Sequence, residues 1–187
     1  MLHATSLTIG FNETEDRIVA VCRDPHGSGV ILLLTRRLVR RLLPALTALL
    51  EHSSLAASKA PIHLRSEVIL MEHQAALFAG KPTGQSAAST GDSETPAPHG
   101  VSDARPSPVN LHNTLVVVSK IDVTTHETHF SLIFQDTDGP QLSMNFDRSD
   151  LHRWVDLLLR TANTADWGID IKADWVAPQH SSKLSVS

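Results

Sequence analysis

Hydrophobic and polar residues alternate in the same order along two stretches of the chain. Residues 7–46 align with residues 119–158 without a gap. Within each stretch, two runs have an apolar residue at every second position, as one face of a β-strand requires. The aligned apolar rows are Ile18, Ala20 and Cys22 with Phe130, Leu132 and Phe134, and Val30, Leu32 and Leu34 with Leu142, Met144 and Phe146. This agreement indicates an internal duplication, although any two stretches of this kind can be aligned to some degree.

A tight turn and a helix complete each stretch. DPHG at 24–27 aligns with DTDG at 136–139, and both contain the Asp and Gly that turns favour. Thr35 and Asp147 are suited to cap the helices that follow. The apolar stripes predicted for these helices are Leu38, Val39, Leu42, Leu43, Leu46, Leu49 and Leu50 in the first, and Leu151, Trp154, Val155, Leu158 and Ala162 in the second. Each unit is therefore predicted to be strand–strand–strand–helix (βββα). We expect Pro44, which lacks an N–H, to bend or divide the first helix.

A further helix and a linker are predicted between the two units. Residues 65–79 (RSEVILMEHQAALFA) should form a helix that makes a helical hairpin with the first one, and Gly80 is placed to end it. The apolar face predicted for this helix consists of Leu64, Val68, Met71, Ala75 and Phe78. Beyond it the composition shifts to Gly, Pro, Ser, Thr and Ala, which predicts a disordered insertion.

The predicted organisation has five parts. They are a first βββα unit at 1–52, the second helix of the hairpin at 53–80, a disordered linker at 81–109, a second βββα unit at 110–176 and a tail at 177–187. The second unit has an extra C-terminal strand, because WGIDIKADW at 167–175 alternates strictly between apolar and polar residues. The fold class that follows is α+β, with antiparallel sheets and helices packed on one side.

Composition narrows the functional classes. The net charge is −4, aromatic residues make up 4% and tyrosine is absent, so a large basic or base-stacking surface is not expected. No stretch approaches the length of a membrane span, and the single Cys22 cannot form an internal disulfide. We expect a cytoplasmic protein without a cofactor.

Four arginines form a basic stripe on the first helix. Arg36, Arg37, Arg40 and Arg41 lie opposite its leucines, and the nearest acid on that helix is Glu51. The simplest interpretation is a solvated helix face. Like charges repel at this spacing, however, and the macrodipole disfavours cations in the first turns of a helix, so a partner that offsets the repulsion is expected.

Two kinds of partner fit this stripe. Residues 110–187 carry six Lys and Arg against ten Asp and Glu, so another copy of the chain offers acidic groups. The alternative is the phosphate backbone of a nucleic acid, which guanidinium groups bind bidentately. The repeated order of elements is similar to that of the PUR and Whirly single-strand-binding folds, in element order only, and this resemblance implies a nucleic-acid partner.

Other candidate residues concern a protein surface and a metal site. Leu157 and Leu159 flank the apolar stripe of the last helix and, with Trp167 and Trp175, are predicted to face a protein partner. His126 and His129, in the run THETH, have a spacing that suits two metal ligands, but no third ligand is identifiable, and polar turn residues are the simpler interpretation.

The sequence therefore predicts a non-enzymatic protein–protein interaction or assembly module that self-associates into a homo-oligomer. The first alternative is a nucleic-acid-binding module that uses the arginine-rich helix. The second is a small enzyme or metal site near His126 and His129. Motifs for phosphate loops, nucleophile elbows and zinc proteases are absent from the sequence, but catalytic residues can also meet from distant positions.

Overall fold

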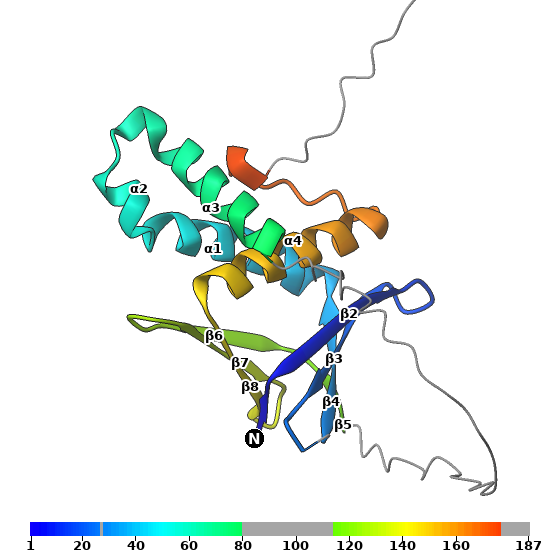
Figure 1. The fold of residues 1–187 in the computed structure, drawn as a ribbon. Coiled ribbons are helices and arrows are strands. Elements are labelled where there is room, and N and C mark those ends of the chain that lie inside the picture. Colours follow the sequence, from blue (N-terminus) through cyan, green and yellow to red (C-terminus); the bar gives the residue numbers. More distant parts are fainter. Residues whose placement is uncertain (27, 80–113, 177–187) are drawn as a thin grey trace, which may run out of the picture.

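The computed structural model describes residues 1–26, 28–79 and 114–176. Two four-stranded β-sheets and four α-helices make up these residues, with the helices packed on one side of the sheets (Figure 1). The predicted α+β class is confirmed. The linker predicted at 81–109 and the tail at 177–187 lie outside the described residues.

The strands fall into two groups of four, each followed by a long helix. The first group is β1 (Leu2–Ala4), β2 (Ser6–Asn12), β3 (Arg17–Arg23) and β4 (Gly29–Thr35), followed by α1 (Arg36–His52). The second is β5 (Thr114–Val117), β6 (Lys120–Thr125), β7 (Phe130–Gln135) and β8 (Pro140–Phe146), followed by α4 (Arg148–Thr164). Between the groups lie α2 (Leu55–Lys59), the 3₁₀ turn η1 (Ile62–Leu64) and α3 (Arg65–Ala79), and the 3₁₀ turn η2 (Asp174–Val176) follows α4.

The two sheets exchange their outermost strands. Sheet I has the order β2-β3-β4-β5 and sheet II the order β1-β8-β7-β6. In each sheet three antiparallel strands come from one unit, and the fourth comes from the other unit and pairs in parallel. The sheets are therefore mixed, and each unit contributes four strands where alternation predicted three. The exchange makes each sheet depend on both units.

The two exchanges have the same register. Leu2 pairs with Leu142, and Thr114 pairs with Val30, so an offset of 112 residues converts one pair into the other. The helices α1 and α4, which begin at Arg36 and Arg148, are related by the same offset. This is a correspondence of arrangement, and descent of both units from one ancestor stays a hypothesis.

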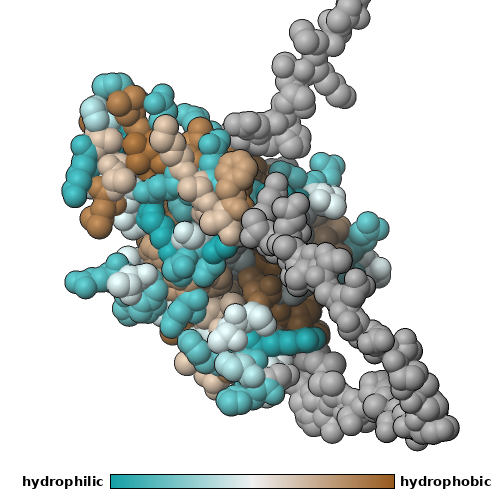
Figure 2. Space-filling model, in the orientation of Figure 1, coloured by the Kyte–Doolittle hydropathy of each residue, from teal (hydrophilic) through white to brown (hydrophobic). Residues whose placement is uncertain are grey.

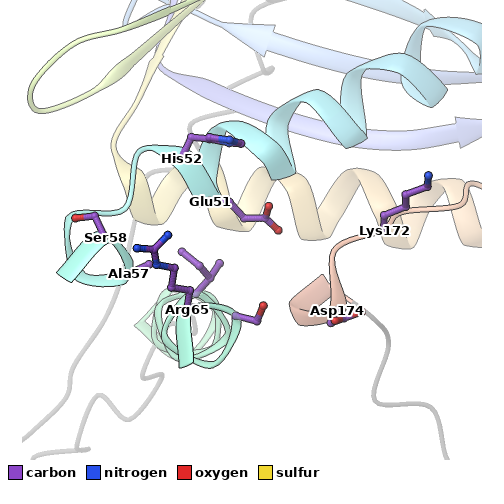
Figure 3. Close-up of a pocket in the computed structure, with 9 residues that line it drawn as sticks. Glu51, His52, Ala57, Ser58, Arg65, Lys172 and Asp174 are labelled. Carbon is purple, nitrogen blue, oxygen red and sulfur yellow. The ribbon is translucent and has the colours of Figure 1, made fainter. Parts of the chain in front are cut away.

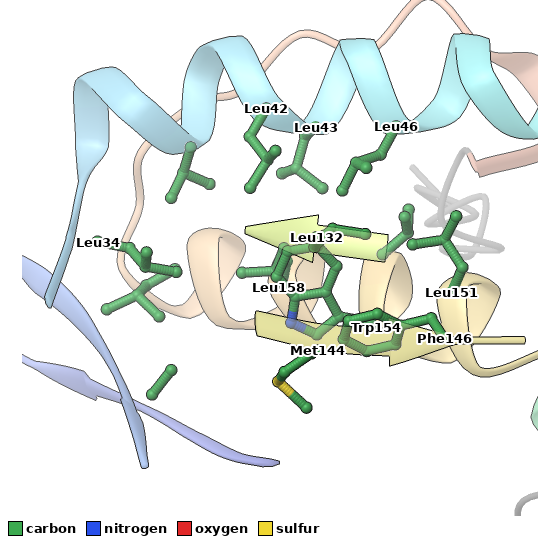
Figure 4. Close-up of a cluster of buried hydrophobic side chains, with 14 of the residues drawn as sticks. Leu34, Leu42, Leu43, Leu46, Leu132, Met144, Phe146, Leu151, Trp154 and Leu158 are labelled. Atoms are coloured by element: carbon green, nitrogen blue, oxygen red, sulfur yellow. The ribbon is translucent and has the colours of Figure 1, made fainter. Parts of the chain in front are cut away.

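The predicted apolar rows form one continuous core between the sheets and the helices. Leu42, Leu43 and Leu46 of α1 point toward the strands and α4, and they belong to the same buried cluster as Leu132 and Trp154 (Figure 4). All five are buried, and each leucine buried in this way contributes about 2 kcal/mol of hydrophobic stabilisation. The inward rows read from the sequence are thus the residues that join the two units.

The helix caps form as predicted, and Pro44 does not divide α1. The Thr35 side chain accepts a hydrogen bond from the Leu38 N–H, and the Asp147 side chain accepts one from the Asp150 N–H. Pro44 lies inside a single helix of 17 residues. Its carbonyl accepts a hydrogen bond from the Thr47 hydroxyl at 2.9 Å, in addition to the bonds of the helix backbone.

The strand predicted at 167–175 is not formed. After α4, Asp166 and Gly168 have positive φ angles of 51° and 54°, which turn the chain back over the helices instead of into a sheet. Trp167 and Trp175 are both buried in this irregular segment, which ends in η2 against α3. The strict alternation reflects one buried row of a segment that packs on helices.

The buried face of α3 also differs from the prediction. Met71 and Phe78 were expected to be buried but are 67% and 71% exposed, whereas Ile69, His73 and Ala76 are buried. Apolar residues lie on both sides of this helix, so periodicity alone did not determine its orientation. None of the helices in residues 1–26, 28–79 and 114–176 is long and apolar enough to cross a membrane.

Candidate interaction surface

The outward face of sheet I is apolar across three of its strands. Strand register places alternate residues of β3, β4 and β5 side by side on the face opposite the core. These outward residues are Val19, Val21, Ile31, Leu33, Leu115 and Val117. Leu115 is 60% and Val117 is 45% exposed, the valines of β3 and Ile31 are half-buried, and Leu33 is buried. We call these six residues the apolar sheet face.

The outward face of sheet II is polar at nearly every corresponding position. Its outward residues are Asp122, Thr124, Ser131, Ile133, Ser143 and Asn145, with His3 on β1. Several of these side chains form hydrogen bonds with one another. The Ser131 hydroxyl donates to the Asn145 side chain at 2.6 Å, and the Ser143 hydroxyl oxygen lies 3.0 Å from Nδ1 of His3. Sheet II therefore presents a surface suited to water, and sheet I does not.

A signal for the apolar sheet face is present in the sequence. The runs IVAVC at 18–22 and VILLL at 30–34 are apolar at every position, not at every second one. Continuous apolar runs are typical of strands that are covered on both faces. Our sequence interpretation used only the row that faces the core and missed the outward one.

Charged residues border this face at both ends of β3. Arg17 and Arg23 point outward on the same side as the apolar residues, and the acidic side chains of Glu13 and Glu15 are exposed in the turn that leads into β3. Within the described residues, these four side chains form no ion pair within 4.0 Å. The face is thus apolar in the middle and carries opposite charges near one of its ends.

The arginine stripe divides into one structural residue and three free ones. The Arg36 guanidinium donates to the Trp167 carbonyl at 2.9 Å, just beyond the end of α4. This hydrogen bond gives Arg36 a partner at the start of α1, where the helix dipole disfavours cations. Arg37, Arg40 and Arg41 are exposed and form no ion pair within the part of the chain that the structure describes.

The predicted partner-facing apolar residues lie largely inside the protein. Trp167 is fully buried and Trp175 is 3% exposed, so the prediction that they face a partner is wrong. Leu159 is partly buried against the core, and Leu157 is 38% exposed. The tryptophans are covered because the chain after α4 folds back onto the helices. Figure 2 shows exposed hydrophobic side chains elsewhere, over α2 and α3, where Leu55 is 78% exposed.

His126 and His129 lie at the turn between β6 and β7. Their rings stack with centroids 4.3 Å apart, and the His126 N–H donates to the His129 carbonyl. Among the described residues no group of three or more His, Cys, Asp or Glu side chains is arranged to hold a metal ion. Cys22 is buried, as expected for a small core residue, and burial raises the pKa of its thiol to about 12.

The structure brings together a polar cluster in the helix layer that sequence reasoning missed. Arg148 donates to the Glu72 carboxylate through two nitrogens, at 3.0 and 2.8 Å, and also to the Ser53 hydroxyl and the Leu50 carbonyl. Ser54 donates to the other oxygen of Glu72. These residues come from the end of α1, the start of α2, α3 and α4, so the cluster fixes the helical hairpin against α4.

Two buried histidines continue this cluster. Nδ1 of His73 lies 3.3 Å from Nδ1 of His152, which requires one ring to donate and the other to accept. Nε2 of His152 is buried without a hydrogen-bond partner, 3.9 Å from Glu72. Burial, the neighbouring His73 and the positive charge of Arg148 lower the pKa of His152 to about 3. Burial also lowers the pKa of His73. Both rings are therefore neutral at pH 7.

Comparison with known proteins gives no family. No family model, no curated protein and no solved structure matches this chain.

Proposed function

We propose that this protein is a non-enzymatic interaction and assembly module that associates with copies of itself through the apolar sheet face. The observation that carries the proposal is the contrast between the two sheets. Six apolar side chains occupy the central outward positions of β3, β4 and β5 in sheet I, while the corresponding positions of sheet II are polar except for Ile133. Exposed apolar surfaces of this kind mark interaction sites.

A second copy is the occupant that the charges around this face favour. Two sheets can pack face to face about 10 Å apart, and a two-fold axis that lies between them, above the middle of β3 and perpendicular to that strand, makes such a contact self-complementary. This symmetry reverses the direction of β3 in the partner. Arg23 of each copy then lies over Arg17 and the turn that carries Glu13 and Glu15 in the other. The contact buries the apolar residues in the middle, and each end gathers two arginines and two glutamates whose charges balance.

The double variant Val21→Thr/Ile31→Thr tests this proposal. Threonine keeps the branched shape and the strand propensity of valine, so the fold should remain. Each replacement puts a hydroxyl group into the contact and removes apolar area from it. We expect the dimer dissociation constant, measured by analytical ultracentrifugation, to rise about thirtyfold or more.

Sheet II supplies the matched control. Ile133 occupies the position that corresponds to Val21, and it lies among polar neighbours. Ile133→Thr should leave association unchanged, while any loss of strand stability should resemble that of Val21→Thr. A wild-type protein that remains monomeric at about 100 μM, where weak dimers are populated, would rule out this assembly.

A nucleic-acid-binding module is the second candidate, because Arg37, Arg40 and Arg41 are exposed without ion pairs among the described residues. Binding through these groups should weaken steeply with salt, as counterions are released from phosphates. The ratio of absorbance at 260 and 280 nm of the purified protein, followed by oligonucleotide titration at two salt concentrations, separates this candidate from self-association.

A further inference from the structure

A pocket of about 430 Å³ opens in the helix layer, on another part of the molecule from the apolar sheet face. It lies between the last turn of α1, α2, the first turns of α3 and the segment that leads into η2 (Figure 3). Its size falls within the range of small-molecule sites in proteins, about 300–1,000 Å³.

The pocket combines an apolar floor with charges of both signs. Ala57 and Ile69, both buried, provide apolar surface, and Arg65, Glu51 and Asp174 provide charge around it. In the described ranges none of these three charged groups forms an ion pair within 4.0 Å. Arg65 makes one long hydrogen bond, to the Ala60 carbonyl at 3.4 Å. Lys172 also lines the pocket. The Arg65 guanidinium and the two carboxylates are therefore available to a ligand.

The Glu51 carboxylate is oriented by a hydrogen bond from a buried residue. The Trp175 indole N–H donates to one of its oxygens at 2.7 Å. Trp175 is itself buried, with its ring 5.2 Å from that of His73 and 5.5 Å from that of His152. A carboxylate oriented by a fixed donor loses little freedom on binding, which favours affinity. Its other oxygen remains for a ligand.

The positions of the charged side chains indicate which charged groups a ligand would carry. Arg65 rises from α3 on one side of the pocket, Glu51 points into it from α1, and Asp174 lies on the side of η2 (Figure 3). The Lys172 ammonium points away from Glu51 in the same view. A ligand carboxylate matches the guanidinium group of Arg65, and a ligand ammonium group matches the charge of the two acids.

We propose that this pocket binds a small zwitterion, namely an α-amino acid with an apolar side chain. Its carboxylate pairs with Arg65, its ammonium with Glu51 and Asp174, and its side chain rests on Ile69 and Ala57. The site is independent of the assembly proposed above, so failure of one leaves the other standing.

Isothermal titration of the full chain with the apolar L-amino acids, L-leucine among them, tests the proposal. For each acid that binds, two analogues follow: the N-acetyl form, which lacks the ammonium charge, and the amide, which lacks the carboxylate. Each should bind about tenfold more weakly or worse, because a charged hydrogen bond is lost. Absence of binding by all the apolar acids up to about 10 mM, or equal binding of the analogues, overturns the proposal.

Variants assign the binding to this pocket. Arg65→Gln and Glu51→Gln should each weaken amino-acid binding about tenfold. Glu51→Gln retains an oxygen that can accept from Trp175, so the pocket wall should stay in place. Arg41→Gln on the exposed side of α1 is the matched control and should bind as the wild type does. Unchanged affinity in both pocket variants, with thermal melts like that of the wild type, would place the ligand elsewhere and refute the site.

Discussion

An arginine stands at the first position of both long helices, but the two side chains have different surroundings. Arg36 of α1 makes one hydrogen bond, to the Trp167 carbonyl, whereas Arg148 of α4 contacts Glu72, Ser53 and the Leu50 carbonyl. In both cases the arginine reaches a carbonyl at or just beyond the end of the other long helix. The shared contact follows from the packing of α1 beside α4. The additional partners of Arg148 are Ser53, directly after α1, and Glu72 of α3. The described residues of the second unit contain no helix that corresponds to α3.

The two sheets also have different outward faces, although their inward faces are alike. Inward positions are apolar in both units because both contribute to one core, so that core restricts them equally. Outward positions have no such restriction: Val19 and Ile31 of sheet I correspond to Ser131 and Ser143 of sheet II. The inward rows therefore specify the fold, and on the sheets the units differ at positions that lie outside the shared core.

The largest predicted difference between the units concerns the two arginines. Arg148→Ala leaves the Glu72 carboxylate in the helix layer without its main partner, and we expect the free energy of unfolding to fall by about 3 kcal/mol. Arg36→Ala removes one hydrogen bond near the surface and should cost about 1 kcal/mol. Urea denaturation of both variants measures the two values. Equal losses would mean that the Glu72 contact adds nothing to the stability.

The next effect is the pH dependence of stability, which should arise in the second unit. The position of His152 in α4 corresponds to the exposed Arg40 in α1. Because the pKa of His152 is lowered from 6.5 to about 3, the unfolded chain binds more protons than the folded protein between these values. The stability from this group is complete above pH 6.5 and decreases as the pH falls, by about 2 kcal/mol at pH 5.

Denaturation midpoints between pH 4 and pH 8 check this prediction. His152→Leu should flatten the profile, because it removes the imidazole that resists protonation. Arg40→Gln, at the corresponding position of α1, should leave the slope as it is in the wild type. If the slope of His152→Leu matched that of the wild type, the origin of any acid sensitivity would lie outside the buried histidine pair.

The smallest effect is expected for the exposed part of the arginine stripe. The variant Arg37→Gln/Arg40→Gln/Arg41→Gln removes charges that form no ion pair among the described residues, and glutamine has a similar helix propensity. We expect the free energy of unfolding to change by less than about 0.5 kcal/mol, and to increase where the loss of like-charge repulsion exceeds other effects. Unchanged self-association and no salt-dependent oligonucleotide binding in the wild type would identify the stripe as a solvated helix face.

The sequence determined the elements whose signals are local. The inward rows of β3, β4, β7 and β8, the caps at Thr35 and Asp147 and the starts of α1 and α4 could all be read from spacing and residue type. Such signals act within a few residues, so the sequence of each stretch alone is enough to predict its element. The apolar sheet face was also readable, from runs without alternation.

Only the tertiary structure decided where segments that are short, or whose pattern fits several positions, pack in the fold. The three residues of β1 carry too little pattern to reveal that they pair in parallel with β8, more than a hundred positions away. Both sides of α3 are apolar, and contact with α4 and η2 selected the side that bears His73. Trp175 alternates like a strand residue, yet it is buried against two histidines from different helices. In each case several placements satisfy the local preferences of the chain. The final one depends on the shape and polarity of surfaces that exist only after distant segments have packed.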